Sequence, residues 1–488
     1  MSTAPTRPER YRLAPDLEIS RIVTGLWQVA DMERQAGRPL DQEAAAEALA
    51  VYAESGFDSF DMADHYGSAE LIAGRLLAGY HKGHKPRAFT KWCPEPGPMT
   101  AEVVRAGIAE RLERLGVERL DLLQLHWWLY EHPAYLDAMA ELARLREEGL
   151  IGELGVTNFD TEHLRILMAE GYPVRTNQVS FSLLDRRAAG PLTAFCQEHG
   201  IRLLAYGTLA GGFMDERWLG AKEPASIADW SRMKYRRFID AIGGWDAFQR
   251  ILAAAGAIAE KHGVKIANVA TRWVLDQPAV AAVIVGARPG ERDHREANLK
   301  AFAFALDAED HARLEAAFAA SRPVPGDCGD EYRRPPFLTA SGDLSHHLGT
   351  LPRVFEAIPD GDRSRVSSGS VWEEVAGYTR ALRVGDRVLV SGTTATHGTD
   401  HVVARGDPAA QTAYVLDKIQ ASLRAVGAGL EDVVRTRVFV RDIAQWEPVA
   451  RTHGRYFRDH RPVNSLVEAK LVGDYLVEIE AEAVVRQA

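Results

Sequence analysis

The feature that most constrains the fold is a regular alternation of short apolar runs with longer segments of helical periodicity. Eight runs lie between about residues 15 and 320: ISRIVTGLW, FDSFDMA, RAFTKW, LDLLQLHWW, IGELGVTNF, TNQVSFSL, IRLLAYGTL and AAVIVGARP. The segments between them are mostly charged and helix-like, for example AEVVRAGIAERLERLG. Strands that alternate with helices are typical of a parallel sheet. Eight such units in one α/β domain favour a closed (β/α)₈ TIM barrel over residues 1–320.

A doubly wound parallel sheet is the alternative fold for this segment. Such sheets bind dinucleotides through a G-x-G-x-x-G loop that directly follows a strand. No sequence of this form follows a strand between residues 15 and 320, which weakens the alternative.

The rest of the chain indicates a second domain, because 488 residues exceed one ordinary domain. Residues 321–365 are dense in proline, glycine and serine and predict a linker, although so long a linker is expected to pack partly on a domain. Residues 366–488 predict a compact α+β domain. Its signals are a hairpin turn at Gly385-Asp386, a helix that begins at Pro408, and a final alternating strand, VEIEAEAV.

Charge and composition exclude several classes of function. A net charge of −10 argues against nucleic-acid partners and against binding to anionic membranes. No apolar run reaches the roughly 18 residues of a membrane-spanning helix, and MSTAPTRPERYRL has no apolar core of a signal peptide. Three cysteines far apart predict reduced thiols, no metal site and a cytoplasmic location.

Polar residues stand where the second, third and fourth strands are expected to end. Asp61 ends the second strand, and Tyr66 follows five residues later; Lys91 ends the third and His126 the fourth. The carboxyl ends of barrel strands form the face that carries active sites. Burying such charged groups costs free energy unless they pair, so their presence indicates a functional site.

A chemical logic connects these four side chains. A tyrosine is a poor acid at neutral pH because its pKa is about 10, and a neighbouring lysine cation lowers that pKa. We interpret Tyr66 as an acid that protonates a carbonyl oxygen as hydride reaches the carbon, with Lys91 tuning it. Asp61 would anchor Lys91, and His126 would orient the carbonyl. The alternatives are a structural ion pair and a core histidine.

These motifs resemble the aldo-keto reductase family over roughly residues 15–315. The matching stretches, in order, are DMADHYG (61–67), FTKW (89–92), LLQLH (122–126), GVTNF (155–159), NQVSFSLLDR (177–186) and LAYGTLAGG (204–212). The resemblance implies that Asp61, Tyr66, Lys91 and His126 are a catalytic tetrad. It implies reduction of a small-molecule aldehyde or ketone, or the reverse alcohol oxidation, with a nicotinamide cofactor on a barrel that has no Rossmann loop.

The resemblance also implies a cofactor site. Thr157, Asn158 and Gln178 would bind the nicotinamide carboxamide, and Tyr206 would stack on its ring. The further residues assigned to the cofactor by resemblance are Gly25, Trp27, Gly207, Thr208, Leu209, Gly286 and Asn298.

One loop of this site bears on the choice of cofactor. VGARPGERDHREAN (285–298) resembles the family's adenosine-phosphate loop but is about two residues longer than the usual form. Arg288 and Arg292 would bind a 2′-phosphate, since guanidinium suits phosphate recognition, and NADPH is therefore favoured over NADH. The alternative is that both arginines are solvated surface charges.

Four tryptophans follow the expected strand ends: Trp27, Trp92, Trp127 and Trp128. They would either wall an aromatic or sugar-binding pocket or cap the rim of the barrel. On the first interpretation, Trp27, Trp92 and Trp127 line the substrate pocket.

Residues 366–488 resemble the reactive intermediate deaminase (Rid, YjgF-like) family. The matching stretches are SSGSVWEEVAGYTRA (367–381), VLVSGTTA (388–395), VGAGLEDVV (426–434) and VEIEAEAV (477–484). The resemblance implies a homotrimer with ligand clefts between subunits, and hydrolysis of enamines or imines by some members. Those deaminases hold the substrate carboxylate with an arginine in P-A-R-[ST].

The position of that arginine is occupied by Asn464, in Pro462-Val463-Asn464-Ser465. A neutral amide cannot make the charge-assisted bidentate pair, so we expect no ordinary imino-acid deaminase activity. Arg461 would point to the opposite face if the segment is a strand. Asn464 and Glu480 are candidates for another ligand, and the alternative is a domain that only oligomerises. Two rival functions remain open: a bifunctional enzyme that handles an imine or enamine, and a non-catalytic NADPH-sensing scaffold.

Overall fold

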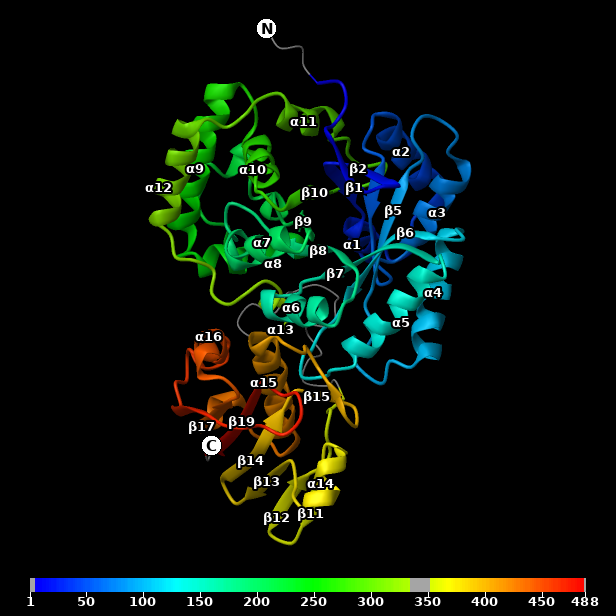
Figure 1. The fold of residues 1–488 in the computed structure, drawn as a ribbon. Coiled ribbons are helices and arrows are strands. Elements are labelled where there is room, and N and C mark those ends of the chain that lie inside the picture. Colours follow the sequence, from blue (N-terminus) through cyan, green and yellow to red (C-terminus); the bar gives the residue numbers. More distant parts are fainter. Residues whose placement is uncertain (1–4, 334–351, 487–488) are drawn as a thin grey trace.

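The computed structural model describes residues 5–333 and 352–486, which form a parallel barrel followed by a smaller α+β domain (Figure 1). The barrel strands are β3 (Ile22–Gly25), β4 (Ser59–Asp61), β5 (Arg87–Trp92), β6 (Leu120–His126), β7 (Ile151–Thr157), β8 (Val174–Ser180), β9 (Arg202–Tyr206) and β10 (Val280–Gly286). The barrel closes where β10 pairs with β3. Each of the eight apolar runs supplies one strand, which confirms the predicted barrel.

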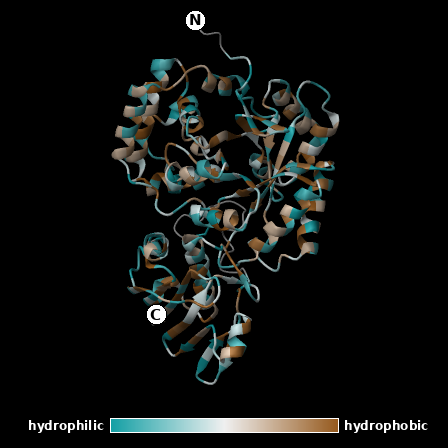
Figure 2. Ribbon diagram, in the orientation of Figure 1, coloured by the Kyte–Doolittle hydropathy of each residue, from teal (hydrophilic) through white to brown (hydrophobic). Residues whose placement is uncertain are grey.

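Helices surround the barrel, and Figure 2 shows that they carry both hydrophilic and hydrophobic residues, as helices with one buried face do. They are α1 (Trp27–Ala36), α2 (Gln42–Glu54), α3 (Ala69–Gly79), α4 (Ala101–Leu115), α5 (Tyr135–Glu147), α6 (Thr161–Ala169), α7 (Pro191–Glu198), α8 (Trp230–Ala241), α9 (Trp245–His262), α10 (Ile266–Leu275), α11 (Arg295–Leu299) and α12 (Ala308–Ala319). Asp41, Thr100 and Asp160 cap the starts of α2, α4 and α6 by accepting backbone N–H groups. Within the described ranges, no helix is long and apolar enough to cross a bilayer.

A hairpin closes the barrel at the amino ends of its strands. It consists of β1 (Arg10–Ala14) and β2 (Leu17–Ser20). Its side chains Leu13 and Ile19 join Phe89 and Leu122 of the barrel interior in one buried apolar cluster. The amino end of the barrel is therefore filled by packed side chains, in contrast to the opposite end, where the strands have their carboxyl ends.

The second domain is built on one seven-stranded sheet in the order β11-β12-β13-β14-β19-β17-β18. The strands are β11 (Ala357–Asp360), β12 (Arg363–Val366), β13 (Ala381–Val384), β14 (Arg387–Thr394), β17 (Val433–Val440), β18 (Val463–Glu468) and β19 (Val477–Val484); a two-stranded sheet of β15 (Thr396–His397) and β16 (His401–Val402) lies beside it. The helices are α14 (Val371–Ala376), α15 (Pro408–Ala425) and α16 (Trp446–Phe457). The hairpin at Gly385-Asp386, the start of α15 at Pro408 and the alternating burial of β19 are as predicted.

Both ends of the segment expected as a linker, residues 321–365, contribute regular structure. At one end α13 (Asp330–Arg333) packs on the barrel, with Glu331 and Tyr332 buried. At the other end β11 and most of β12 pair into the sheet of the second domain. The middle of the expected linker lies outside the described residues.

The two domains meet through buried ionic contacts. His163 on α6 lies between Asp160, at 2.7 Å, and Asp417 on α15, at 2.8 Å. Burial alone would lower the pKa of His163, but the two carboxylates outweigh burial and raise that pKa to about 9. At neutral pH a charged imidazole therefore joins the domains.

This contact predicts how stability depends on pH. The folded protein binds the His163 proton more tightly than the unfolded chain does, whose histidine pKa is about 6.5. The stabilisation that the His163 contact gives is complete below the unfolded-state pKa of about 6.5. It is lost as pH rises through the folded-state pKa of about 9. Melting temperatures of the wild type and of His163→Gln, measured from pH 6 to 9.5, should therefore converge as pH rises. A difference that stays constant or grows would contradict this assignment.

Candidate functional site

A cavity of about 700 Å³ opens at the carboxyl ends of the barrel strands. It is lined by the four tetrad candidates, Asp61, Tyr66, Lys91 and His126, and by all thirteen cofactor candidates, Gly25, Trp27, Thr157, Asn158, Gln178, Tyr206, Gly207, Thr208, Leu209, Gly286, Arg288, Arg292 and Asn298. This volume is typical of a small-molecule site. Residues far apart in the sequence are thus brought to one place because parallel strands end on one face.

A buried ion pair forms the floor of the cavity. Lys91 Nζ lies 2.7 Å from Asp61 Oδ2 and also donates to the backbone oxygen of Met62 at 2.8 Å. The other carboxylate oxygen of Asp61 accepts from Gln178 Nε2 at 2.7 Å and Gln124 Nε2 at 3.2 Å. Neither charge is left without a partner, as burial requires.

Tyr66 is half-buried on the loop after β4. Lys91 Nζ lies 5.0 Å from the centroid of its ring, so the phenol stands next to the buried cation. Gly67 follows with a φ of 58°, and a Cβ atom there would collide with the carboxylate of Glu33. Glycine at this position thus permits the tight turn that presents Tyr66 to the cavity.

His126 is buried beside the ion pair at the end of β6. Its Nδ1 lies 3.7 Å from Cys93 Sγ and its Nε2 lies 3.4 Å from Asn158 Nδ2. Burial, reinforced by nearby cations of which Arg333 has the largest effect, holds the pKa of His126 well below its usual range. The imidazole is therefore neutral and can hydrogen-bond to an uncharged carbonyl group.

The residues assigned to the nicotinamide carboxamide, Thr157, Asn158 and Gln178, lie at or near the ends of β7 and β8, and Tyr206, assigned to stack on the ring, ends β9. The buried Thr157 Oγ1 makes no hydrogen bond to any residue that the structure describes. Asn158 has a φ of 59°, and its Oδ1 lies 2.8 Å from the Tyr206 hydroxyl. An unsatisfied buried hydroxyl beside an amide fits a ligand that carries its own amide group.

A glycine loop and several cations border the outer part of the cavity. Gly207 has a φ of 75°, and a Cβ there would press on the ring and hydroxyl of Tyr235. Arg288 lies 2.6 Å from Asp31 and 3.4 Å from Glu291, so its charge is partly matched. Positive side chains that the sequence interpretation did not select also line this part: Arg217, Arg232 and Lys265. Together these groups fit the phosphates of a dinucleotide.

Two of the three tryptophans expected in the substrate pocket do not reach it. Trp92 packs against Gly107 of α4, outside the barrel. Trp127 donates its Nε1–H to the backbone oxygens of Leu129 and His132. Trp27 lines the cavity as expected, and Trp128 takes the place of the other two.

Strand alternation explains this correction. Successive side chains of a strand point to opposite faces. Because Lys91 and His126 point inward, Trp92 and Trp127 must point outward, whereas Trp128 returns to the cavity side. The same rule marks Gln124, two residues before His126, as an inward polar residue that the sequence interpretation missed.

The segment formed by residues 327–333, which we name the active-site tail, supplies the main part of the site that the sequence did not predict. Its Glu331 is fully buried and lies 2.8 Å from both Arg187 Nη2 and the Tyr206 hydroxyl. The ring of Tyr332 lies 5.2 Å from that of His126 and 5.9 Å from that of Trp128. The tail therefore walls the cavity directly above the catalytic candidates.

Beside Tyr66, the structure also brings together one group of side chains that could ligate a metal ion, Asp64, His65 and Cys93. Sequence spacing predicted no metal site. The Asp64 carboxylate already accepts the backbone N–H of Cys93 and lies 2.8 Å from His65 Nδ1.

The two candidates of the second domain lie on opposite faces of its sheet. Asn464 lines a groove of about 420 Å³ and donates to Thr436 at 2.9 Å. Glu480 pairs with Arg437 at 2.6 Å and does not line that groove. Arg461 precedes β18 rather than belonging to it, has a φ of 48° and lines the groove. The strand-face argument against Arg461, which required Arg461 to be part of the strand, therefore does not apply.

Comparisons with known proteins agree with this geometry. Residues 21–319 match the sequence model described as "Aldo/keto reductase family". The chain belongs to the aldo/keto reductase family. Residues 370–485 match "Endoribonuclease L-PSP", which confirms a Rid-like domain fused to the reductase.

Several relatives match the barrel of this aldo/keto reductase. Pyridoxal reductase of Arabidopsis thaliana chloroplasts is 25% identical over 63% of this chain and 85% of its own length. An NADH-specific methylglyoxal reductase of Escherichia coli is 23% identical over 57% of this chain and 88% of its own length. A glycerol dehydrogenase structure from Gluconobacter oxydans shares the fold, with a TM-score of 0.52 and 24% identity over 67% of this chain and 98% of its own. The chain is thus an oxidoreductase that acts on carbonyl compounds.

Proposed function

We propose that the protein reduces an aldehyde or ketone with NADPH and that Tyr66 is the proton donor. The observation that carries the proposal is the buried Asp61–Lys91 pair beside Tyr66 and His126 in one cavity. A structural ion pair alone would not need a phenol and a neutral imidazole facing the same space. The complete set also argues against a non-catalytic NADPH-sensing scaffold.

Each side chain has a distinct task in this reaction. Bound in the cavity, the nicotinamide would supply the hydride that the carbonyl carbon accepts. His126 donates a hydrogen bond to the carbonyl oxygen and orients it, and Tyr66 transfers its proton to that oxygen as negative charge develops there. Lys91 stabilises the resulting phenolate, and Asp61 with its two glutamine partners holds Lys91 in place. In alcohol oxidation, the same groups act in reverse.

The preference for NADPH rests on the cations at the outer part of the cavity. Arg288 and Arg292 belong to the loop assigned to the adenosine phosphate, and both line the cavity. Arg288 is partly matched by Asp31, and one relative is described as NADH-specific.

Fluorescence titration of the purified protein tests the proposal without a substrate. We expect micromolar binding of NADPH and at least tenfold weaker binding of NADH, because guanidinium groups bind the additional phosphate. Arg292→Ala should weaken NADPH binding but leave NADH binding unchanged. Equal affinities for the two cofactors would refute the preference, and binding of neither would refute the reductase proposal.

We further propose that the Rid-like domain assembles the protein into a trimer. The sheet face opposite α15 carries the exposed apolar side chains Leu389, Val463 and Val467, which a second copy would cover. Light scattering after size exclusion should give three times the mass of one chain for the wild type. The Val467→Glu variant should give the mass of a single chain. A wild-type monomer at micromolar concentration would contradict the proposal.

A further inference from the structure

One arginine of the Rid-like domain contacts the active-site tail. Arg455 on α16 lies 2.8 Å from the carboxylate of Asp327, the first residue of the tail. The same guanidinium lies 3.4 Å from Asp160 and 3.3 Å from Glu162 at the start of α6. The side chains of Arg455 and Asp327 are about three-quarters buried, and that of Asp160 is almost fully buried.

The two backbone segments that Arg455 joins both border Asn158. Asp160 follows Asn158 by two residues and caps α6. On the tail, Gly329 has a φ of 90°, and a Cβ there would collide with the Asn158 backbone oxygen. Arg333 donates to that same oxygen at 2.7 Å. The tail thus lies directly against the residue that also contacts His126 and Tyr206.

We propose that the Rid-like domain completes the reductase site, with Arg455 as a positioning residue that holds the active-site tail against Asn158 and His126. Without Arg455, the buried Asp327 carboxylate would lose its counter-charge, and the start of the tail would no longer be held against α6. Glu331 would keep its contacts with Arg187 and Tyr206, so Tyr332 would stay near the cavity but be held less firmly as a wall of the substrate pocket. This inference rests on the proposed function only for its kinetic test.

Other contacts hold the two domains together independently of Arg455. His163 pairs with Asp417, and Arg424 pairs with Glu131 on the loop after β6. His401 lies 2.7 Å from Glu170. Removal of the Arg455 guanidinium should therefore free the tail while the domains stay docked.

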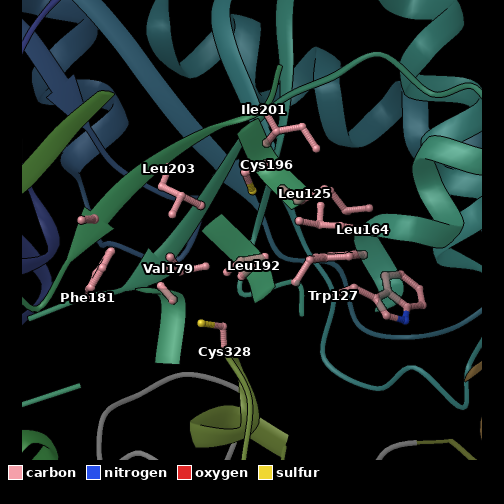
Figure 3. Close-up of a cluster of buried hydrophobic side chains, with 14 of the residues drawn as sticks. Leu125, Trp127, Leu164, Val179, Phe181, Leu192, Cys196, Ile201, Leu203 and Cys328 are labelled. Atoms are coloured by element: carbon pink, nitrogen blue, oxygen red, sulfur yellow. The ribbon is translucent and has the colours of Figure 1, made fainter. Parts of the chain in front are cut away.

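A buried thiol in the active-site tail can show whether the tail has moved away from the barrel. Cys328 is buried in an apolar cluster that also contains Cys196 and Leu192 of α7 (Figure 3). Because Cys196 belongs to the barrel and Cys328 to the tail, release of the tail exposes only Cys328. Unfolding of the barrel exposes both thiols.

The test is alkylation of the full-length protein by iodoacetamide, followed by mass spectrometry of the two cysteine peptides. In Arg455→Ala, Cys328 should react at least tenfold faster than in the wild type, with Cys196 unchanged. Arg455→Lys should restore most of the protection. Arg424→Ala, the matched control, removes an arginine from the same interface without touching the tail and should react as the wild type does.

Kinetics with 4-nitrobenzaldehyde give a second readout. Arg455→Ala should raise KM for this aldehyde about tenfold and lower kcat by less than about threefold, because Tyr332 of the tail walls the substrate side whereas Tyr66 and Lys91 lie outside the tail. If no variant turns over the aldehyde, the reductase proposal fails. Accelerated alkylation of Cys328 in Arg455→Ala would still support the proposal that Arg455 positions the tail.

The positioning role of Arg455 is refuted if Cys328 reacts at the wild-type rate in Arg455→Ala. It is equally overturned if both cysteines accelerate together, since Arg455 would then only stabilise the fold. Should Arg455→Ala not fold, Asp327→Asn removes the bridge from the side of the tail. Faster alkylation of Cys328 alone in that variant supports the positioning role of Arg455, and an unchanged rate refutes it.

Discussion

Replacing Tyr66 by phenylalanine should lower kcat for 4-nitrobenzaldehyde by about 10²–10⁴-fold, the usual contribution of a positioned acid. The phenyl ring keeps the shape of the turn and its contact with Lys91, and the substitution removes the transferable proton. The dissociation constant of NADPH should stay within about twofold, because the hydroxyl acts on the substrate in the transition state. Stopped-flow turnover and fluorescence titration measure the two quantities.

The matched control for this prediction is Tyr80→Phe. Tyr80 ends α3 and does not line the cavity, so removal of its hydroxyl should leave both constants unchanged. Substantial turnover by Tyr66→Phe would exclude Tyr66 as the donor. Loss of NADPH binding along with turnover would instead indicate that the phenol shapes the cofactor site.

The barrel and its tetrad candidates were predictable because both follow from local patterns. Apolar runs of strand length alternate with helical segments, and parallel strands bring their carboxyl ends to one face. Asp61 and His126 each end a strand, and Lys91 is the last residue but one of β5, so their meeting follows from topology alone. The same alternation, continued past the end of β6, would also have separated Trp128 from Trp127.

The active-site tail could not be predicted in this way. Its residues follow α12 in a segment rich in proline and glycine, where no periodicity fixes a direction for Glu331 or Tyr332. Glu331 is placed by a tertiary ion pair with Arg187, which lies 144 positions away in the sequence. The contacts of Arg455 with the tail depend on how two domains dock, and neither domain's own sequence pattern encodes that docking.

The second large effect concerns the ion pair below the cavity. Asp61→Asn should destabilise the protein by about 3–5 kcal/mol, because Lys91 would stay buried with no counter-charge. Lys91→Met should cost less, since Asp61 keeps its hydrogen bonds from Gln124 and Gln178. The double variant should lose less than the sum of the single losses, because it contains no unpaired charge.

Urea unfolding at pH 7, followed by tryptophan fluorescence, gives this order of stabilities. A control pair in the same protein is Lys82 and Glu54, which is exposed and should contribute less than about 1 kcal/mol by the same double-mutant cycle. Equal losses of stability in Asp61→Asn and Lys91→Met would mean that the hydrogen bonds from Gln124 and Gln178 do not compensate the Asp61 carboxylate for the loss of Lys91. Strictly additive losses of unfolding free energy would mean that the two charges do not interact. That result would also refute the proposal that Asp61 anchors Lys91.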